Sequence, residues 1–258
     1  MEKLIDNNDV EQIYAPEGAP MSVAVLLSGS GTNFIAIYEE AERLRRAGES
    51  VYGKVDAVFT NAPKCKGAEK ARECGIPVIS LSSNRYFGTL DKGPEDEEAR
   101  EYYDAAVITL IEQVCAPDLI VLAGYRRRLG GGFINRYKNK IINLYPGDIT
   151  KDYLVRGIDA SVQALRAGEK DIKCTVYLER EGERFGPALV QSEPIALKGF
   201  KERNIESLNH KIREDGEWKI FPYAVHELIA KGRAAADGDG NIYVDGEKLD
   251  ASGFQFRG

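Results

Sequence analysis

The stretch VAVLLSGSGTNFIAIYEEAERLRRAG, residues 23–48, decides the fold class. Its first part, 23–28, is an apolar run of the kind found in strands that are buried on both faces of a parallel sheet. The glycine-rich segment GSGTN (29–33) follows, and from residue 34 apolar side chains recur with helical periodicity. The stretch therefore predicts a strand, a glycine turn and an amphipathic helix.

The same alternation continues toward the C-terminus. Further strands are predicted at 55–61, 77–81, 117–125 and 141–145, with helices at 68–75, 95–115 and 133–140. A regular alternation of strands and helices predicts an α/β fold with a doubly wound, mostly parallel sheet.

Beyond about residue 172 the pattern changes. Residues 174–197 alternate with period two around a glycine turn, which predicts an antiparallel addition in the form of a hairpin. Residues 205–232 are typical of helices, and 234–249 predict a small hairpin with Asp-Gly turns. We expect a lead-in or edge strand followed by one domain, divided as 1–20 and 21–258, with an α/β half at 22–150 and a C-terminal half at 151–258.

Composition limits the partners. The 258 residues are 43% hydrophobic and 29% charged, which suits a globular protein, and the net charge of −6 provides no basic field for nucleic acid. No stretch has the ~20 apolar residues that cross a bilayer, so no membrane partner is expected. The four cysteines form no Cys-x-x-Cys pair, which favours a reducing cytoplasm.

Two histidines and dispersed cysteines offer no metal-ligand spacing, so no metal is expected. His226 falls on a helical stretch and is expected to be a packing or surface residue, while His210 sits among charges. Neither histidine is expected in a catalytic site.

The glycine turn has two interpretations. Glycines between a buried strand and a helix let a ligand approach the backbone, and the free amides of the helix N-terminus attract an anion. The turn lacks the lysine of a nucleoside-triphosphate loop and the third glycine of a dinucleotide site, so a monophosphate is the better fit. The alternative is an ordinary turn that Thr32 or Asn33 caps.

Ligands of open parallel sheets bind beyond the carboxyl ends of the strands. Three such ends are marked by Ser28, Tyr125 and Tyr145, and one cleft could contain all three. The run Arg126–Arg128 follows the most apolar strand, so it is either a ligand-binding cluster or a solvated loop.

Six segments, in this order and spacing, resemble the phosphoribosylglycinamide formyltransferase family of the formyltransferase fold: LLSGSGTN (26–33), FTN with CGIPV (59–78), DLIVLAGYRRRL (118–129), IINLYPG (141–147), TVYLEREGERFGPALVQ (175–191) and EWKIFPYAV (217–225). The resemblance extends from about Ser22 to Gly246. It implies a purine-pathway enzyme that moves a formyl group from 10-formyltetrahydrofolate to the amine of glycinamide ribonucleotide, a small phosphorylated substrate.

The resemblance also implies site residues. Gly31, Thr32 and Asn33 correspond to the phosphate site, and Glu217 to a position that holds the amine substrate. The folate-binding positions correspond to Arg100, Arg126, Arg127, Arg128, Leu129 and Asn143. For Arg100 and Glu217 the commoner role of such residues, a surface charge on a helix, is the expectation from the sequence alone.

The catalytic positions depart from the family. Tyr145 stands where the family has its proton-transferring histidine, and Arg184, or a slipped Glu183, replaces the acid that orients it. Asp159, Ser161 and Tyr177 stand where further histidines occur in the family.

Asn143 and Tyr145 point to the same side at the mouth of a strand. Arg184 would lower the phenol pKa and make Tyr145 a base, or the phenol would donate to a developing oxyanion with Asn143 as second donor. Alternatively, Tyr145 is only an aromatic wall. Three hypotheses follow: a formyltransferase, a catalytically altered or inactive relative that binds a phosphorylated ligand, and an enzyme of the formyltransferase fold with a different carbonyl chemistry on another phosphorylated substrate.

Overall fold

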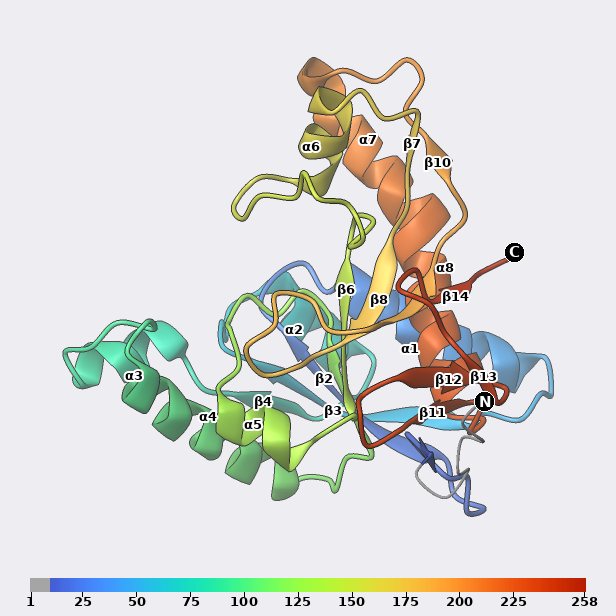
Figure 1. Cartoon of the computed structure of the whole chain (residues 1–258). Helices are drawn as coiled ribbons and strands as arrows, with labels where there is room; N and C mark the ends of the chain where they lie inside the picture. Colours follow the sequence, from blue (N-terminus) through green and yellow to red (C-terminus); the bar gives the residue numbers. More distant parts are fainter. Residues whose placement is uncertain (1–9) are drawn as a thin grey trace, which may run out of the picture.

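A large central sheet organises the computed structural model, which describes residues 10–258 (Figure 1). Within these residues its eight strands follow the order β14-β9-β8-β6-β5-β2-β3-β4. Most neighbours are parallel, whereas β8 pairs antiparallel with β6 and β9. The bounds are β2 Met21–Leu27, β3 Gly53–Thr60, β4 Val78–Ser80, β5 Leu119–Leu122, β6 Ile141–Tyr145, β8 Thr175–Leu178, β9 Ala188–Gln191 and β14 Phe254–Gln255. The predicted fold class is confirmed.

Helices cover both faces of this sheet. Val23, Val25 and Leu27 of β2 belong to one core, and the alternating Ala24 and Leu26 belong to the other. Because successive side chains of a strand point to opposite faces, β2 is buried on both sides. The first core is covered by α1 Thr32–Arg46 and α2 Lys66–Glu73, and the second by α3 Ser83–Thr89, α4 Glu97–Glu112 and α5 Gly131–Arg136.

A long C-terminal helical segment completes the first face. It consists of α7 Ile205–Ile212, η3 Arg213–Glu217, α8 Trp218–Tyr223 and η4 Ala224–Ile229, in which η3 and η4 are π-helical turns. The α8 part packs against α1. His226 is buried there with Nε2 2.9 Å from the Ile37 carbonyl oxygen, whereas His210 is exposed and lies 3.1 Å from Glu214. His226 therefore has the packing role that was expected.

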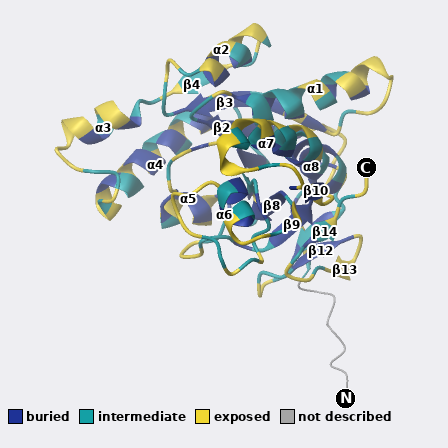
Figure 2. Cartoon of the chain, turned by 90° about the horizontal axis from the view of Figure 1, so that it is seen from above, coloured by how far each residue is buried: buried dark blue, intermediate teal, exposed yellow. Residues whose placement is uncertain are grey.

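The remaining C-terminal elements lie above the sheet in Figure 1. They are α6 Ala160–Arg166, the ribbon of β7 Asp171–Ile172 and β10 Ile195–Ala196, and η2 Glu202–Asn204. Figure 2 shows that buried residues concentrate in the central strands, while exposed residues lie mainly on the outer parts of the helices and loops.

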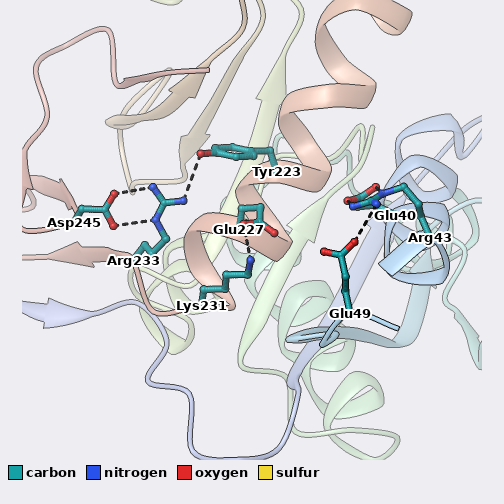
Figure 3. A network of polar contacts seen from close by, with 8 residues as sticks. All are labelled: Glu40, Arg43, Glu49, Tyr223, Glu227, Lys231, Arg233 and Asp245. Atoms are coloured by element: carbon teal, nitrogen blue, oxygen red, sulfur yellow. Dashed lines mark hydrogen bonds and ion pairs between the residues drawn. The ribbon is translucent and has the colours of Figure 1, made fainter. Parts of the chain in front are cut away.

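A second, antiparallel sheet is formed by β1 Glu11–Gln12, β11 Ala234–Ala236, β12 Ile242–Val244 and β13 Glu247–Lys248. Arg233 joins it to α8: its guanidinium donates twice to Asp245, at 2.9 and 2.7 Å, and reaches the Tyr223 hydroxyl at 3.4 Å (Figure 3). The hairpin predicted at 234–249 is confirmed. Of the two alternatives for the lead-in, its described part contains an edge strand, β1, while 1–9 lie outside the described residues. The division of the chain near residue 150 stays a prediction.

Two helices, α3 and α6, were not predicted, and the helix predicted at 95–115 was too long. The α3 segment contains Gly88 and several polar residues of low helix propensity, but Ser82 caps it by accepting from the Arg85 amide at 3.4 Å. The helix predicted at 95–115 begins at Glu97, because the Asp96 carboxylate accepts from the Ala99 amide at 2.9 Å. Among residues 10–258, no helix has the length and apolar character needed to cross a membrane.

Candidate functional site

A cavity of about 410 Å³ opens at the carboxyl ends of β5 and β6. Its lining includes eight residues that the sequence singled out: Arg100, Arg126, Arg127, Arg128, Leu129, Asn143, Tyr145 and Arg184. Seven arginines and four glutamates of the described chain line this arginine-lined cavity, so its formal charge is positive. Such a cavity favours an anionic ligand.

Several contacts orient the arginines. The Ser28 hydroxyl accepts from the Arg126 amide at 2.9 Å, and the Arg127 guanidinium donates to the Ser83 hydroxyl at 3.0 Å. Ser28 thus supports the arginine loop and does not line the cavity, so the cleft contains two of the three predicted strand ends. The side chain of Arg100 is only 14% exposed, which corrects its interpretation as a surface charge.

Two carboxylates of α4 hold the glycine segment 130–132 beside these arginines. Asp104 accepts from the Gly130 amide at 2.6 Å, and Glu101 accepts from the Gly132 amide at 3.1 Å. A Cβ on Gly130 would lie 2.3 Å from Glu101 Oε1, so a larger residue there would displace the Glu101 carboxylate. Asp104 is buried, and burial raises its pKa to about 7.

Asp104→Asn is expected to remove a pH dependence of stability. The folded carboxyl binds its proton up to about pH 7, whereas an unfolded aspartate loses it near 3.8, so wild-type stability falls as pH rises between these values. The unfolding free energy of the variant relative to wild type should therefore be higher at pH 8 than at pH 5 by roughly 2–4 kcal/mol. Urea unfolding at both pH values measures this difference, with the exposed Asp152→Asn as control. An equal difference at both pH values contradicts it.

Asn143, Tyr177 and Glu179 form a hydrogen-bonded cluster on one face of the β6–β8 pair. The Asn143 side-chain amide donates to the Tyr177 hydroxyl at 2.9 Å and to Glu179 Oε1 at 2.7 Å, and its oxygen accepts from the Leu144 amide. Both amide hydrogens are engaged. Asn143 is therefore at the cavity, as predicted, but it is not free to serve as the predicted second oxyanion donor.

The Tyr145 ring lies against Gly147 of the turn that follows β6. Its ring lies 4.7 Å from the Phe185 ring, and a Cβ on Gly147 would stand 2.7 Å from its Cε1 atom, so the glycine makes room for the ring. The phenol oxygen is buried and has no hydrogen-bond partner among the described residues. Tyr145 thus presents a hydroxyl without a hydrogen bond of standard geometry, although the Gln163 side chain is near enough to lower its pKa.

The prediction that Arg184 makes Tyr145 a base is wrong. Burial raises the pKa of Tyr145 above its ordinary value and outweighs the lowering by Arg184, so the group stays a phenol at neutral pH. Arg184 instead lies over the Phe185 ring, 4.9 Å from its centre, and donates to the Leu154 carbonyl. The alternative in which the phenol donates a hydrogen bond agrees with this arrangement.

A second cavity, of about 240 Å³, adjoins the first and is here called the Glu217 cavity. Tyr145 and Ile158 line both cavities. Asp159 and Ser161 also line the Glu217 cavity, at positions the sequence had marked as departures from the family. Burial raises the pKa of Glu217, which corrects its interpretation as an exposed helix charge.

The glycine turn reaches the Glu217 cavity through Asn33. The Asn33 side-chain amide donates to Glu217 Oε2 at 2.8 Å, so two predicted substrate residues meet. Gly31 has φ 69° and precedes α1, which has no acidic residue in its first turn. Thr32 lies apart, in a groove along α1 and α8. Within residues 10–258, no group of His, Cys, Asp and Glu is arranged to hold a metal ion.

Two cavity residues escaped the sequence analysis. Glu179 and Arg180 both line the arginine-lined cavity, and the Arg180 terminal nitrogens are buried without a partner among the described residues. The signal for Glu179 was its position two residues after Tyr177, directly beyond the end of β8, where extended backbone places both side chains on one face.

A family model described as formyl transferase matches residues 21–225 of the chain. Phosphoribosylglycinamide formyltransferase of Escherichia coli (strain K12) is 27% identical over 234 residues, which are 91% of this chain and 98% of the relative. The trifunctional purine biosynthetic protein adenosine-3 of Drosophila melanogaster is 31% identical over 80% of this chain, which spans only 14% of that protein.

A solved structure agrees with these relatives. Phosphoribosylglycinamide formyltransferase from Coxiella burnetii superposes with a TM-score of 0.76 at 25% identity and covers 93% of this chain and 100% of its own.

Proposed function

Since the chain belongs to the formyl transferase family, we propose that it transfers the formyl group of 10-formyltetrahydrofolate to the amine of glycinamide ribonucleotide or of a related phosphorylated amine. One observation carries this proposal: Tyr145 lines both the arginine-lined cavity and the Glu217 cavity. Direct transfer between two ligands is fast when both are held side by side in a defined orientation, and the two adjoining cavities would hold them in this way.

The arginine-lined cavity suits the folate. It is bounded by apolar residues such as Leu122 and Leu129 and by arginines, and folate has an aromatic ring system and terminal carboxylates. Arg180 supports this assignment, because its buried guanidinium nitrogens have no partner among the described residues and can donate hydrogen bonds to a carboxylate. The bound folate supplies the formyl carbon.

The Glu217 cavity suits the acceptor. Glu217, Asp159 and Ser161 offer groups that hydrogen-bond ribose hydroxyls and an amine, and Arg213 adds a positive charge. We propose that the N-terminus of α1, with Gly31 and Asn33, receives the phosphate, as its free amides favour an anion. The acceptor would place the chain in purine biosynthesis, in the cytoplasm.

Tyr145 would act at the border. As the amine nitrogen approaches the formyl carbon, negative charge develops on the formyl oxygen, and a preorganised donor lowers the energy of that charge. The Tyr145 hydroxyl is protonated, buried and uncommitted, as such a donor must be. We therefore propose that Tyr145, which stands where the family has a histidine, provides the hydrogen-bond donor at this position in place of that histidine.

Rates with phosphorylated and unphosphorylated acceptors test the acceptor class. Transfer from 10-formyltetrahydrofolate should be faster with glycinamide ribonucleotide than with its dephosphorylated nucleoside, mainly through a lower KM, since phosphate binding acts on both ground and transition state. Equal kcat/KM for the two acceptors would contradict a phosphate site.

A further inference from the structure

Glu179 is an acidic side chain of the arginine-lined cavity, and its backbone amide donates to the Ile141 carbonyl of β6 at 3.0 Å. It follows β8 directly, and its side chain meets Asn143 and Tyr177 on the face that carries Tyr145. Both hydrogen bonds go to Oε1, from Asn143 at 2.7 Å and from Tyr177 at 3.3 Å. Oε2 accepts nothing from the described residues, and Glu179 lines the arginine-lined cavity.

The formyl transfer requires a proton acceptor. The bond between the amine nitrogen and the formyl carbon forms while the bond from that carbon to the folate nitrogen breaks. The amine must lose one proton, and the departing folate nitrogen must gain one. Tyr145 is a phenol at neutral pH and cannot take that proton, and neither His210 nor His226 lines the arginine-lined cavity or the Glu217 cavity.

We propose that Glu179 is the proton-transferring group of this site, taking the proton from the amine through Oε2 and returning it to the departing folate nitrogen. The inference rests on the proposed function. Asn143 and Tyr177 hold Oε1, which fixes the carboxyl and keeps its second oxygen for the substrate. Among the described residues Glu179 has no ion-pair partner within 4.0 Å, so its charge is not committed to a structural salt bridge.

Burial supports this role. Burial raises the pKa of Glu179 by more than the hydrogen bonds from Asn143 and Tyr177 lower it. A carboxyl whose pKa is closer to neutrality transfers protons more readily near pH 7. The charged groups that line the same cavity are Glu97 and Arg100 of α4, arginines 126–128 after β5, Arg156 before α6 and the charged residues of 180–184 after β8. Tyr125 and Tyr145 also line it, and Tyr177 contacts Glu179 directly.

Glu179→Gln tests the proposal, because the glutamine oxygen still accepts from Asn143 and Tyr177. We expect kcat for transfer to fall ~10²-fold with folate binding by calorimetry unchanged. In the wild type kcat should rise with pH through the Glu179 titration, and the variant should lose this acidic limb. Glu112→Gln is the control, since Glu112 also accepts a tyrosine hydroxyl, from Tyr137 at 3.1 Å, outside both cavities.

The outcomes are distinct. A variant with wild-type kcat, or one with a reduced kcat and an unchanged pH profile, would overturn the role of Glu179 while the proposed function stands. A Glu179→Asp variant that keeps the acidic limb at a lower rate would support it. A wild type that transfers no formyl group to any amine would overturn both proposals.

Discussion

Tyr145→Phe is expected to lower kcat for formyl transfer ~10²–10³-fold, the usual cost of removing one oxyanion donor. The reason is that the phenol is the one group that borders both cavities with an uncommitted proton among the described residues. Its pKa is raised by burial, so the proton remains in place at neutral pH. KM values should change little, because the donor acts on charge that exists only in the transition state.

Stability separates this effect from damage to the fold. The Tyr145 hydroxyl has no partner within residues 10–258, so its removal should leave the unfolding free energy unchanged or slightly higher. The Phe185 ring contact, at 4.7 Å between centres, survives in the variant. Tyr38→Phe, which removes a phenol from α1 away from both cavities, is the matched control. If kcat of Tyr145→Phe equalled that of the wild type, the hydroxyl would have no role in catalysis, and Tyr145 would only contribute an aromatic surface to the cavities.

Gly31→Ala is expected to cost about 3 kcal/mol or more of stability and to raise KM for glycinamide ribonucleotide at least ~10-fold. Two causes add. The residue has φ 69°, where a side chain is strained, and its added Cβ would lie 2.5 Å from the Gly67 Cα atom, which is backbone and cannot turn aside. Gly67 in turn donates its amide to the Gly29 carbonyl at 2.9 Å, so the displacement would pass into the glycine turn 29–33.

Gly48→Ala provides the matched control. Gly48 follows the other end of α1 with φ 72°, but nothing lies within 4 Å of its added Cβ. It should lose only about 1 kcal/mol and leave KM unchanged. Urea unfolding and acceptor titrations of both variants measure the difference. If Gly31→Ala lost no more stability and raised KM no more than Gly48→Ala, the contact with Gly67 would not restrict residue 31, and the prediction would be wrong.

Much of the fold followed from sequence because the buried strands are locally distinct. The apolar runs that became β2, β5 and β6 are strands whose ends position the cavity residues, and the arginines after β5 lie where ligands of parallel sheets bind. The helix α3 was hidden because its cap, Ser82, supplies what its residues lack in propensity. These features depend on residues within a few positions of one another.

The chemistry of the site could not be read as well, since it depends on pairing between distant strands. Asn143 stands opposite Tyr177 only because β8 runs antiparallel to β6, and this register brings Glu179 to Asn143. Phe185 lies on Tyr145 and beneath the Arg184 guanidinium, so the arginine next to it in sequence does not pair with the phenol. Burial is the largest influence on the Tyr145 pKa and raises it, and this effect cannot be inferred from the neighbouring charges in the sequence.

The central claim is that this site still transfers a formyl group with a tyrosine at the border of its two cavities. The most direct test incubates the purified chain with 10-formyltetrahydrofolate and glycinamide ribonucleotide and quantifies both products, with calorimetry of each ligand alone. We expect equal amounts of formylated glycinamide ribonucleotide and tetrahydrofolate, formed catalytically. Binding of both ligands without any transfer would contradict it.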